Sequence, residues 1–166
     1  MMINNDIHIG LLEDDKYMSS VIKNFLQKNP LWKVTTYLSP EDIQFDNLPD
    51  IMIFDYFMGS STTGNTSEEA LKKIKLINPE LPVIFFTSSK DINTALKVLF
   101  RGAEDYIVKD INNFQKLKNS IEETIKTKNR LEELKIMRKE LKETKRKIIV
   151  YGSILLGLSV AISMIV

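Results

Sequence analysis

The sequence predicts an α/β protein: a doubly wound, five-stranded parallel sheet over residues 6–125, followed by a C-terminal helical stalk and a transmembrane helix. Short apolar runs alternate with amphipathic segments of helical period, which is typical of βαβ units around a parallel sheet. Polar residues follow directly on several of these runs. Charge then divides the remaining chain into a basic segment over 126–147 and an uncharged one over 148–166.

Five apolar runs are predicted to be buried strands. They cover residues 7–12, 32–38, 51–54, 83–86 and 106–108. The predicted helices between and after them cover residues 16–27, 67–77, 93–100 and 112–125. The segment 39–50 contains two prolines, so any helix there is limited to two turns.

Local signals place the ends of three of these helices. Asp15 is a candidate N-cap for the first helix. Thr66 and Glu69 have the spacing of a capping box at the start of the second. Gly102 is a candidate C-terminal stop for the third. These signals support the alternation of strands and helices.

Composition limits the chemistry of the chain. Its 166 residues have room for one domain of ordinary size and an appendage. Cysteine is absent, which excludes disulfides, thiolate metal sites and a cysteine nucleophile. The net charge of +1 conceals an acidic N-terminal part and a basic excess in residues 126–147.

The basic segment 126–147 lacks proline and glycine and is predicted to be helical. Leu131, Leu134, Leu141 and Ile148 fit heptad seam positions, but the alternate seam positions are Arg138 and Lys145, so this register predicts a weak coiled coil. A solvated spacer and a segment held near anionic lipid headgroups are the alternatives.

The final segment, 148–166, contains eleven Ile, Leu or Val among its 19 residues. As a helix it would be about 28 Å long, close to the roughly 30 Å of a membrane's hydrocarbon core. We therefore expect a single-pass C-terminal anchor, with a buried core helix as the alternative. The cations that precede it predict that the domain formed by residues 6–125 lies in the cytoplasm. Small residues at Ser153, Gly157 and Ala161 leave open the pairing of two such helices in a homodimer.

Polar side chains stand where the predicted strands end. The first strand leads into Glu13, Asp14 and Asp15, and the third leads into Asp55. Thr87 and Lys109 follow the fourth and fifth strands. Ligands of open parallel sheets bind at this edge. Several carboxylates converging there would repel one another without a cation, and Mg²⁺ suits such oxygen ligands and phosphate.

Four motifs carry a resemblance to a known family: LLEDD, IFDYFMG, FFTSS and DYIVKD, at successive strand ends. Together they resemble the flavodoxin-like receiver domain of two-component response regulators over about residues 6–125. The resemblance implies that Asp55 is the phosphoacceptor. It also implies that Glu13, Asp14, Asp55 and the carbonyl of Phe57 hold Mg²⁺.

The same resemblance implies that Thr87 and Lys109 bind the phosphoryl oxygens and that Tyr106 is an aromatic switch. Two residues depart from the family's pattern. Gly59 and Asp110 stand where proline is common, and the Lys109–Asp110 bond, cis in the family when proline follows, is left open here.

The expected function is phosphoryl acceptance from a sensor histidine kinase or a histidine phosphotransfer protein, with output by protein contact. The chain is expected to be a phosphoacceptor and not an enzyme, apart from self-catalysed phosphorylation and dephosphorylation. The alternatives are a non-phosphorylated adaptor and a phosphoryl sink. No nucleic-acid partner is expected, because no recognition motif accompanies the basic segment.

Overall fold

The computed structural model describes residues 6–59 and 66–163. Five parallel strands form one sheet in the order β2-β1-β3-β4-β5. They are β1 (Ile7–Leu12), β2 (Trp32–Tyr37), β3 (Ile51–Phe54), β4 (Val83–Thr87) and β5 (Asp105–Val108). The order reverses between β1 and β3, which confirms the predicted doubly wound sheet.

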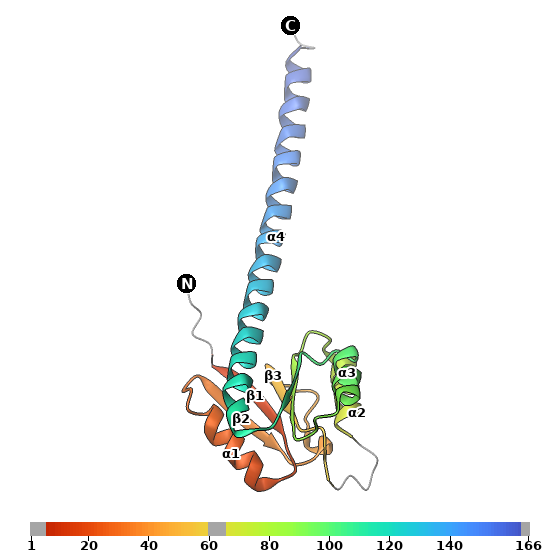
Figure 1. Cartoon of the computed structure of the whole chain (residues 1–166). Helices are drawn as coiled ribbons and strands as arrows, with labels where there is room; N and C mark the ends of the chain where they lie inside the picture. Colours follow the sequence, from red (N-terminus) through yellow and green to blue (C-terminus); the bar gives the residue numbers. More distant parts are fainter. Residues whose placement is uncertain (1–5, 60–65, 164–166) are drawn as a thin grey trace. The chain divides into compact units, whose positions relative to one another are not determined.

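Helices cover both faces of this sheet. They are α1 (Lys16–Leu26), α2 (Ser67–Ile77), α3 (Ile92–Phe100) and α4 (Phe114–Ser163), with short 3-10 turns at Pro40–Asp42 and Ile111–Asn113. Helices α2 and α3 lie on one face, and α1 and the first turns of α4 lie on the other (Figure 1). The segment 39–50 contains only the first of the 3-10 turns, as its prolines predict.

Neighbouring residues of β4 point to opposite faces because side chains alternate along a strand. The ring of Phe86 lies 5.4 Å from that of Phe114 on α4. The ring of Phe85 lies 5.7 Å from that of Phe54, in the core cluster that includes Leu71 of α2. Both faces of the sheet are therefore closed by apolar side chains.

The predicted helix ends are confirmed. A carboxylate oxygen of Asp15 accepts the N–H groups of Tyr17 and Met18 at the start of α1. Thr66 and Glu69 form the reciprocal bonds of a capping box. Gly102 follows α3 with φ +93°, a conformation that side chains disfavour. Asp15 and Thr66 thus fix where the loops after β1 and β3 end and where α1 and α2 begin.

The second part of the chain differs from the prediction. The chain separates into two compact units, residues 1–124 and 125–166, and α4 runs unbroken from one into the other. Among the described residues, no helix carries an apolar stretch of the length that a membrane crossing requires. The predicted transmembrane helix over 148–166 is thus not supported. Its part within α4, 148–163, would rise only about 24 Å, and residues 164–166 lie outside the described residues.

Candidate functional site

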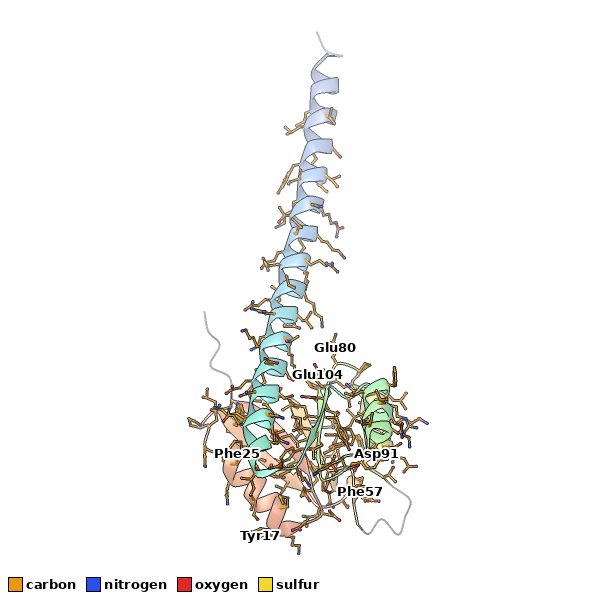
Figure 2. The ribbon with its side chains drawn as sticks, viewed as in Figure 1. Tyr17, Phe25, Phe57, Glu80, Asp91 and Glu104 are labelled. Atoms are coloured by element: carbon orange, nitrogen blue, oxygen red, sulfur yellow. The ribbon has the colours of Figure 1, made fainter. Side chains whose placement is uncertain are left out.

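The candidate site lies where the parallel strands end. Figure 2 shows Glu80 and Glu104, which precede β4 and β5, at one end of the sheet, and Phe57, which follows β3, at the opposite end. Backbone hydrogen bonds continue the strand pairing beyond the strands. The N–H of Asp55 donates to the carbonyl of Leu12 at 2.9 Å, and the N–H of Lys109 donates to that of Thr87 at 2.7 Å. This alignment brings residues distant in sequence together.

Three carboxylates converge at this end of the sheet. Glu13, Asp14 and Asp55 each offer one oxygen, and these oxygens all lie within 4.8 Å of one another. Glu13 and Asp55 are buried, with 2% and 7% exposure. Carboxylate oxygens are the ligands that Mg²⁺ prefers. These three carboxylates fit the predicted magnesium ligands. The predicted role of the Phe57 carbonyl as a fourth ligand stays a prediction.

The ammonium of Lys109 joins two of these carboxylates. Its Nζ atom lies 2.5 Å from Glu13 Oε2 and 2.8 Å from Asp55 Oδ2, and the lysine side chain is 10% exposed. Burial raises the pKa of Glu13 above its usual value, although the hydrogen bond and charge of Lys109 oppose this. A buried carboxylate is retained in charged form only with such partners. Lys109 is therefore placed beside the predicted phosphoacceptor.

The loop after β3 holds the acidic residues by bonds that sequence reasoning missed. The N–H of Gly59 donates to Asp14 Oδ2 at 2.6 Å, and Ser67 Oγ donates to the carbonyl of Asp55 at 2.6 Å. Proline has no N–H to donate. Gly59, noted in the sequence only as a departure from the family pattern, thus provides a bond that the usual proline could not.

The other two predicted residues are near the site but are bonded to Ser89. Thr87 is fully buried, and its Oγ1 accepts the N–H of Ser89 at 3.4 Å. The hydroxyl of Tyr106 donates to the carbonyl of Ser89 at 3.0 Å, and its ring stacks on Phe85. Their roles toward a phosphoryl group stay predictions. The Lys109–Asp110 bond is trans.

A second charged cluster links the loop after β3 to two helices. The hydroxyl of Tyr56, next to Asp55, donates to Glu68 at 2.6 Å. Glu68 on α2 pairs with Lys97 on α3 and with Arg101, which directly follows α3. Burial by itself would raise the pKa of Glu68, but its hydrogen bonds to Lys97 and Tyr56 and the charge of Arg101 bring it below the usual value. Glu68 lies about 30 residues before Lys97 and Arg101, and no sequence pattern predicted that they would pair.

Comparisons with known proteins agree with this geometry. A family model described as the response regulator receiver domain matches residues 9–122. The "Probable C4-dicarboxylate response regulator DctR" of Priestia megaterium is 32% identical over 117 residues, which cover 68% of this chain and 49% of that protein. The "Transcriptional regulatory protein ZraR" of Escherichia coli O157:H7 is 36% identical over 125 residues, covering 75% of this chain and 27% of that protein. The chain thus spans about half or less of these relatives.

Solved structures show the same fold. A response regulator receiver domain protein from Clostridium thermocellum has a TM-score of 0.66 and 25% identity, covering 75% of this chain and 98% of that one. The BeF3-activated DrrB receiver domain has a TM-score of 0.63 and 26% identity, covering 72% and 97%. With its sheet order, its acidic site and these matches, the chain belongs to the response regulator receiver domain family of two-component signalling.

Proposed function

We propose that this protein accepts a phosphoryl group on Asp55 from a histidine kinase or a histidine phosphotransfer protein and signals by protein contact. One observation carries the proposal. Oδ2 of Asp55 lies 2.8 Å from Nζ of Lys109. One carboxylate oxygen each of Asp55, Glu13 and Asp14 lies within 4.8 Å of the other two. The proposed nucleophile, a cation and two further carboxylates that could hold a metal ion are thus grouped at one edge of the sheet.

In the proposed reaction, an oxygen of Asp55 attacks the phosphorus of the donor. A new P–O bond forms, and the P–N bond to the donor histidine breaks with its electron pair on nitrogen. Lys109 then moves its ammonium toward the phosphoryl oxygens as negative charge develops on them. Thr87 offers a hydroxyl for one of those oxygens. Bound Mg²⁺, held by Glu13, Asp14, Asp55 and the carbonyl of Phe57, would supply positive charge between nucleophile and phosphate.

The test is the intact mass of the full chain after incubation with Mg²⁺ and a small phosphodonor such as acetyl phosphate. Wild type should gain one phosphoryl group, and Asp55→Asn should gain none. Asp15→Asn is the matched control, because Asp15 caps α1 and lies outside the carboxylate cluster. Absence of any gain on wild type would instead favour a non-phosphorylated adaptor.

A phosphoryl sink would accept the group without an output. A change of oligomeric state or partner binding on addition of the phosphoryl mimic beryllofluoride supports a switch, and no change favours the sink. The catalysis that we propose is limited to the gain and loss of the chain's own phosphoryl group, and no nucleic-acid partner is proposed.

Attachment to a membrane, with the receiver domain in the cytoplasm, rests on the sequence of residues 142–166. The apolar side chains of Ile148, Ile149 and Leu155 are between 65% and 68% exposed, next to the basic residues 145–147. Flotation of the full chain with vesicles of neutral and of anionic lipid tests this proposal. A variant that ends at residue 147 should no longer float with the vesicles. Flotation of this truncated chain equal to that of the full chain would contradict the proposal.

A further inference from the structure

Helix α4 carries an apolar seam at heptad spacing along one side. Seven of its eight a and d positions are apolar or aromatic, and those seven side chains are between 56% and 67% exposed. The a positions are Leu134, Leu141, Ile148 and Leu155, and the d positions are Met137, Thr144, Tyr151 and Leu158. Alternate spacings of three and four residues over more than three heptads are the pattern of a coiled coil. We name these eight residues the α4 seam.

This register differs from the one that starts at Leu131. That register placed Arg138 and Lys145 inside the seam, where two like charges would face each other. In the α4 seam they occupy e positions, at its margin, and Met137 and Tyr151 take inner positions instead. Thr144 is the one α4 seam residue with a small polar side chain. The seam therefore continues from the charged segment 126–147 into the apolar segment 148–158.

The charges beside the α4 seam select one partner and one direction. Glu133 and Glu140 occupy g positions, five residues before Arg138 and Lys145 at e positions. In a parallel pair of helices, each g residue faces the e residue five positions later in the partner chain. Two copies of this chain in register would therefore form Glu133–Arg138 and Glu140–Lys145 pairs, each twice.

An antiparallel pair lacks this complementarity. There g positions face g positions and e positions face e positions. Over the same seam, the charged part of one helix would lie beside the uncharged residues 148–158 of the other, so Glu133 and Glu140 would have no cation opposite them. The charge pattern therefore favours parallel, in-register pairing of two copies.

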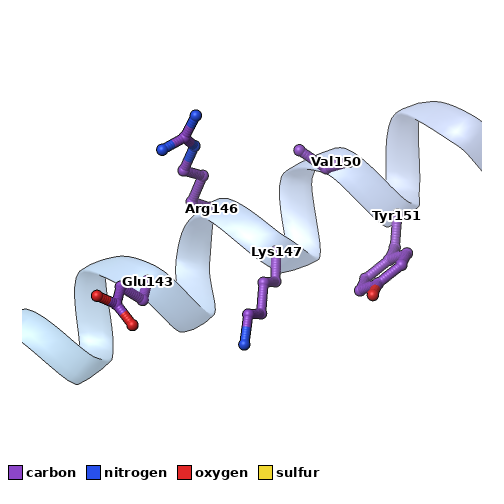
Figure 3. A pocket seen from close by; sticks show the side chains of 5 residues that line it. All are labelled: Glu143, Arg146, Lys147, Val150 and Tyr151. Carbon is purple, nitrogen blue, oxygen red and sulfur yellow. The ribbon is translucent and has the colours of Figure 1, made fainter.

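Side-chain directions on α4 agree with the assignment. Figure 3 shows Lys147 and Tyr151 on one side of the helix and Arg146 and Val150 on the opposite side. Tyr151 is a d position and Lys147 is the neighbouring g position, whereas Arg146 and Val150 are at f and c. The shallow hollow that these four residues and Glu143 line belongs to this single helix. It is a stretch of helix surface and not an enclosed cavity.

We infer that two copies of this chain pair through the α4 seam as a parallel, two-stranded coiled coil over residues 134–158. The pair tethers two receiver domains to the same end of the coil. Their effective concentration is then raised toward the millimolar range, so that a weak contact between them becomes populated. The inference does not rest on phosphorylation of Asp55.

The absence of cysteine permits a direct test in the full chain. Single substitutions Leu134→Cys and Leu155→Cys place a thiol at each end of the seam. Lys139→Cys and Ser153→Cys, at outward f positions, are the matched controls. Under mild oxidation, both seam variants should form disulfide-linked dimers at a rate several-fold above their controls. In an antiparallel pair the two ends of the seam would lie far apart, and neither would cross-link to itself.

Three results would overturn the inference: equal cross-linking at seam and f positions, no cross-linking at all, or cross-linking at residue 155 alone. The last result would indicate contact between the apolar ends without a coil over the charged segment. A charge swap adds a second measurement. Glu133→Lys with Glu140→Lys should reduce cross-linking at residue 134, and adding Arg138→Glu with Lys145→Glu should restore it. The same rates in Asp55→Asn separate this inference from the proposed phosphoacceptor function.

Discussion

The backbone N–H of Gly59 donates a 2.6 Å hydrogen bond to the carboxylate of Asp14, a residue 45 positions earlier in the chain. The bond ties the loop after β3 to the acidic residues after β1. It orients one of the three carboxylates that fit a magnesium ion. Hydrogen bonds from neighbouring groups to the residues that bind a metal hold those ligands in position.

Gly59→Pro should weaken Mg²⁺ binding by about tenfold, because it removes the donor that orients Asp14. Isothermal titration calorimetry measures the change. Gly59→Ala is the control, since it keeps the N–H. A Cβ at that position would lie 3.2 Å from Asp14 Oδ2, which a small shift relieves. Equal affinities for the proline and alanine variants would show that the bond has no part in holding the ion.

Lys109→Met should destabilise the metal-free protein by about 3 kcal/mol. It leaves Glu13 and Asp55 as buried carboxylates without their shared cation, and breaking a buried pair from one side is costly. Urea denaturation in EDTA measures the loss, and added Mg²⁺ should recover part of it.

The matched control for Lys109→Met is Lys33→Met. It breaks the pair with Asp6, in which both side chains are more than half exposed. Exposed pairs contribute about 1 kcal/mol or less. A loss at Lys109 as small as the loss at Lys33 would contradict the buried charge arrangement.

Mg²⁺ binding should strengthen as pH rises from 4.5 through the raised pKa of Glu13, because the metal competes with a proton for this carboxylate. Burial raises the pKa of this carboxyl from its usual 4.5, so its proton persists to higher pH. Calorimetric affinities across this range measure the effect. Asp42→Asn is a control, since it removes an acidic group outside the cluster and should keep the wild-type pH profile.

The sign reverses for stability without metal. A raised folded-state pKa means that the contribution of Glu13 to stability is present below pH 4.5 and is lost as pH rises through the raised pKa. Urea midpoints in EDTA should therefore show a decline over that interval that is absent in Glu13→Gln. An identical decline in the variant would assign it to other groups.

Glu68→Gln should lower stability near neutral pH by about 1 kcal/mol, a modest value because Lys97 and Arg101 are about half exposed. The pKa of Glu68 is lowered from 4.5, so its contribution is present above pH 4.5 and is lost as pH falls through the lowered pKa. The gap between wild type and variant should close over that interval. Glu122→Gln, in an exposed pair with Lys118, should show a smaller gap at every pH.

Sequence reasoning predicted the sheet because short, mostly apolar runs alternate with amphipathic helical segments, whose ends are marked by caps such as Asp15 and Gly102. It identified Glu13, Asp55 and Lys109 because strand ends meet at one edge of a parallel sheet. It could not find the bond between Gly59 and Asp14 or the Glu68 cluster. Those contacts depend on the path of loops and on helix placement, which no local pattern encodes.

The C-terminal part shows a different limit. Helices were predicted here, and α4 is helical. Helix propensity did not show, however, that the last helix of the receiver domain continues unbroken to Ser163. Hydropathy over 148–166 predicted a membrane span that the described part of the helix does not support. The heptad register read from Leu131, Leu134, Leu141 and Ile148 also missed Met137 and Tyr151, which complete the α4 seam.

The most direct test of the central claim is a crystal structure of the protein with Mg²⁺ and beryllofluoride. We predict beryllofluoride on the carboxylate of Asp55, Mg²⁺ on Glu13, Asp14, Asp55 and the carbonyl of Phe57, and Lys109 and Thr87 in contact with fluorine atoms. Beryllofluoride absent from Asp55, or Mg²⁺ bound away from these carboxylates, would contradict the claim that this site accepts a phosphoryl group.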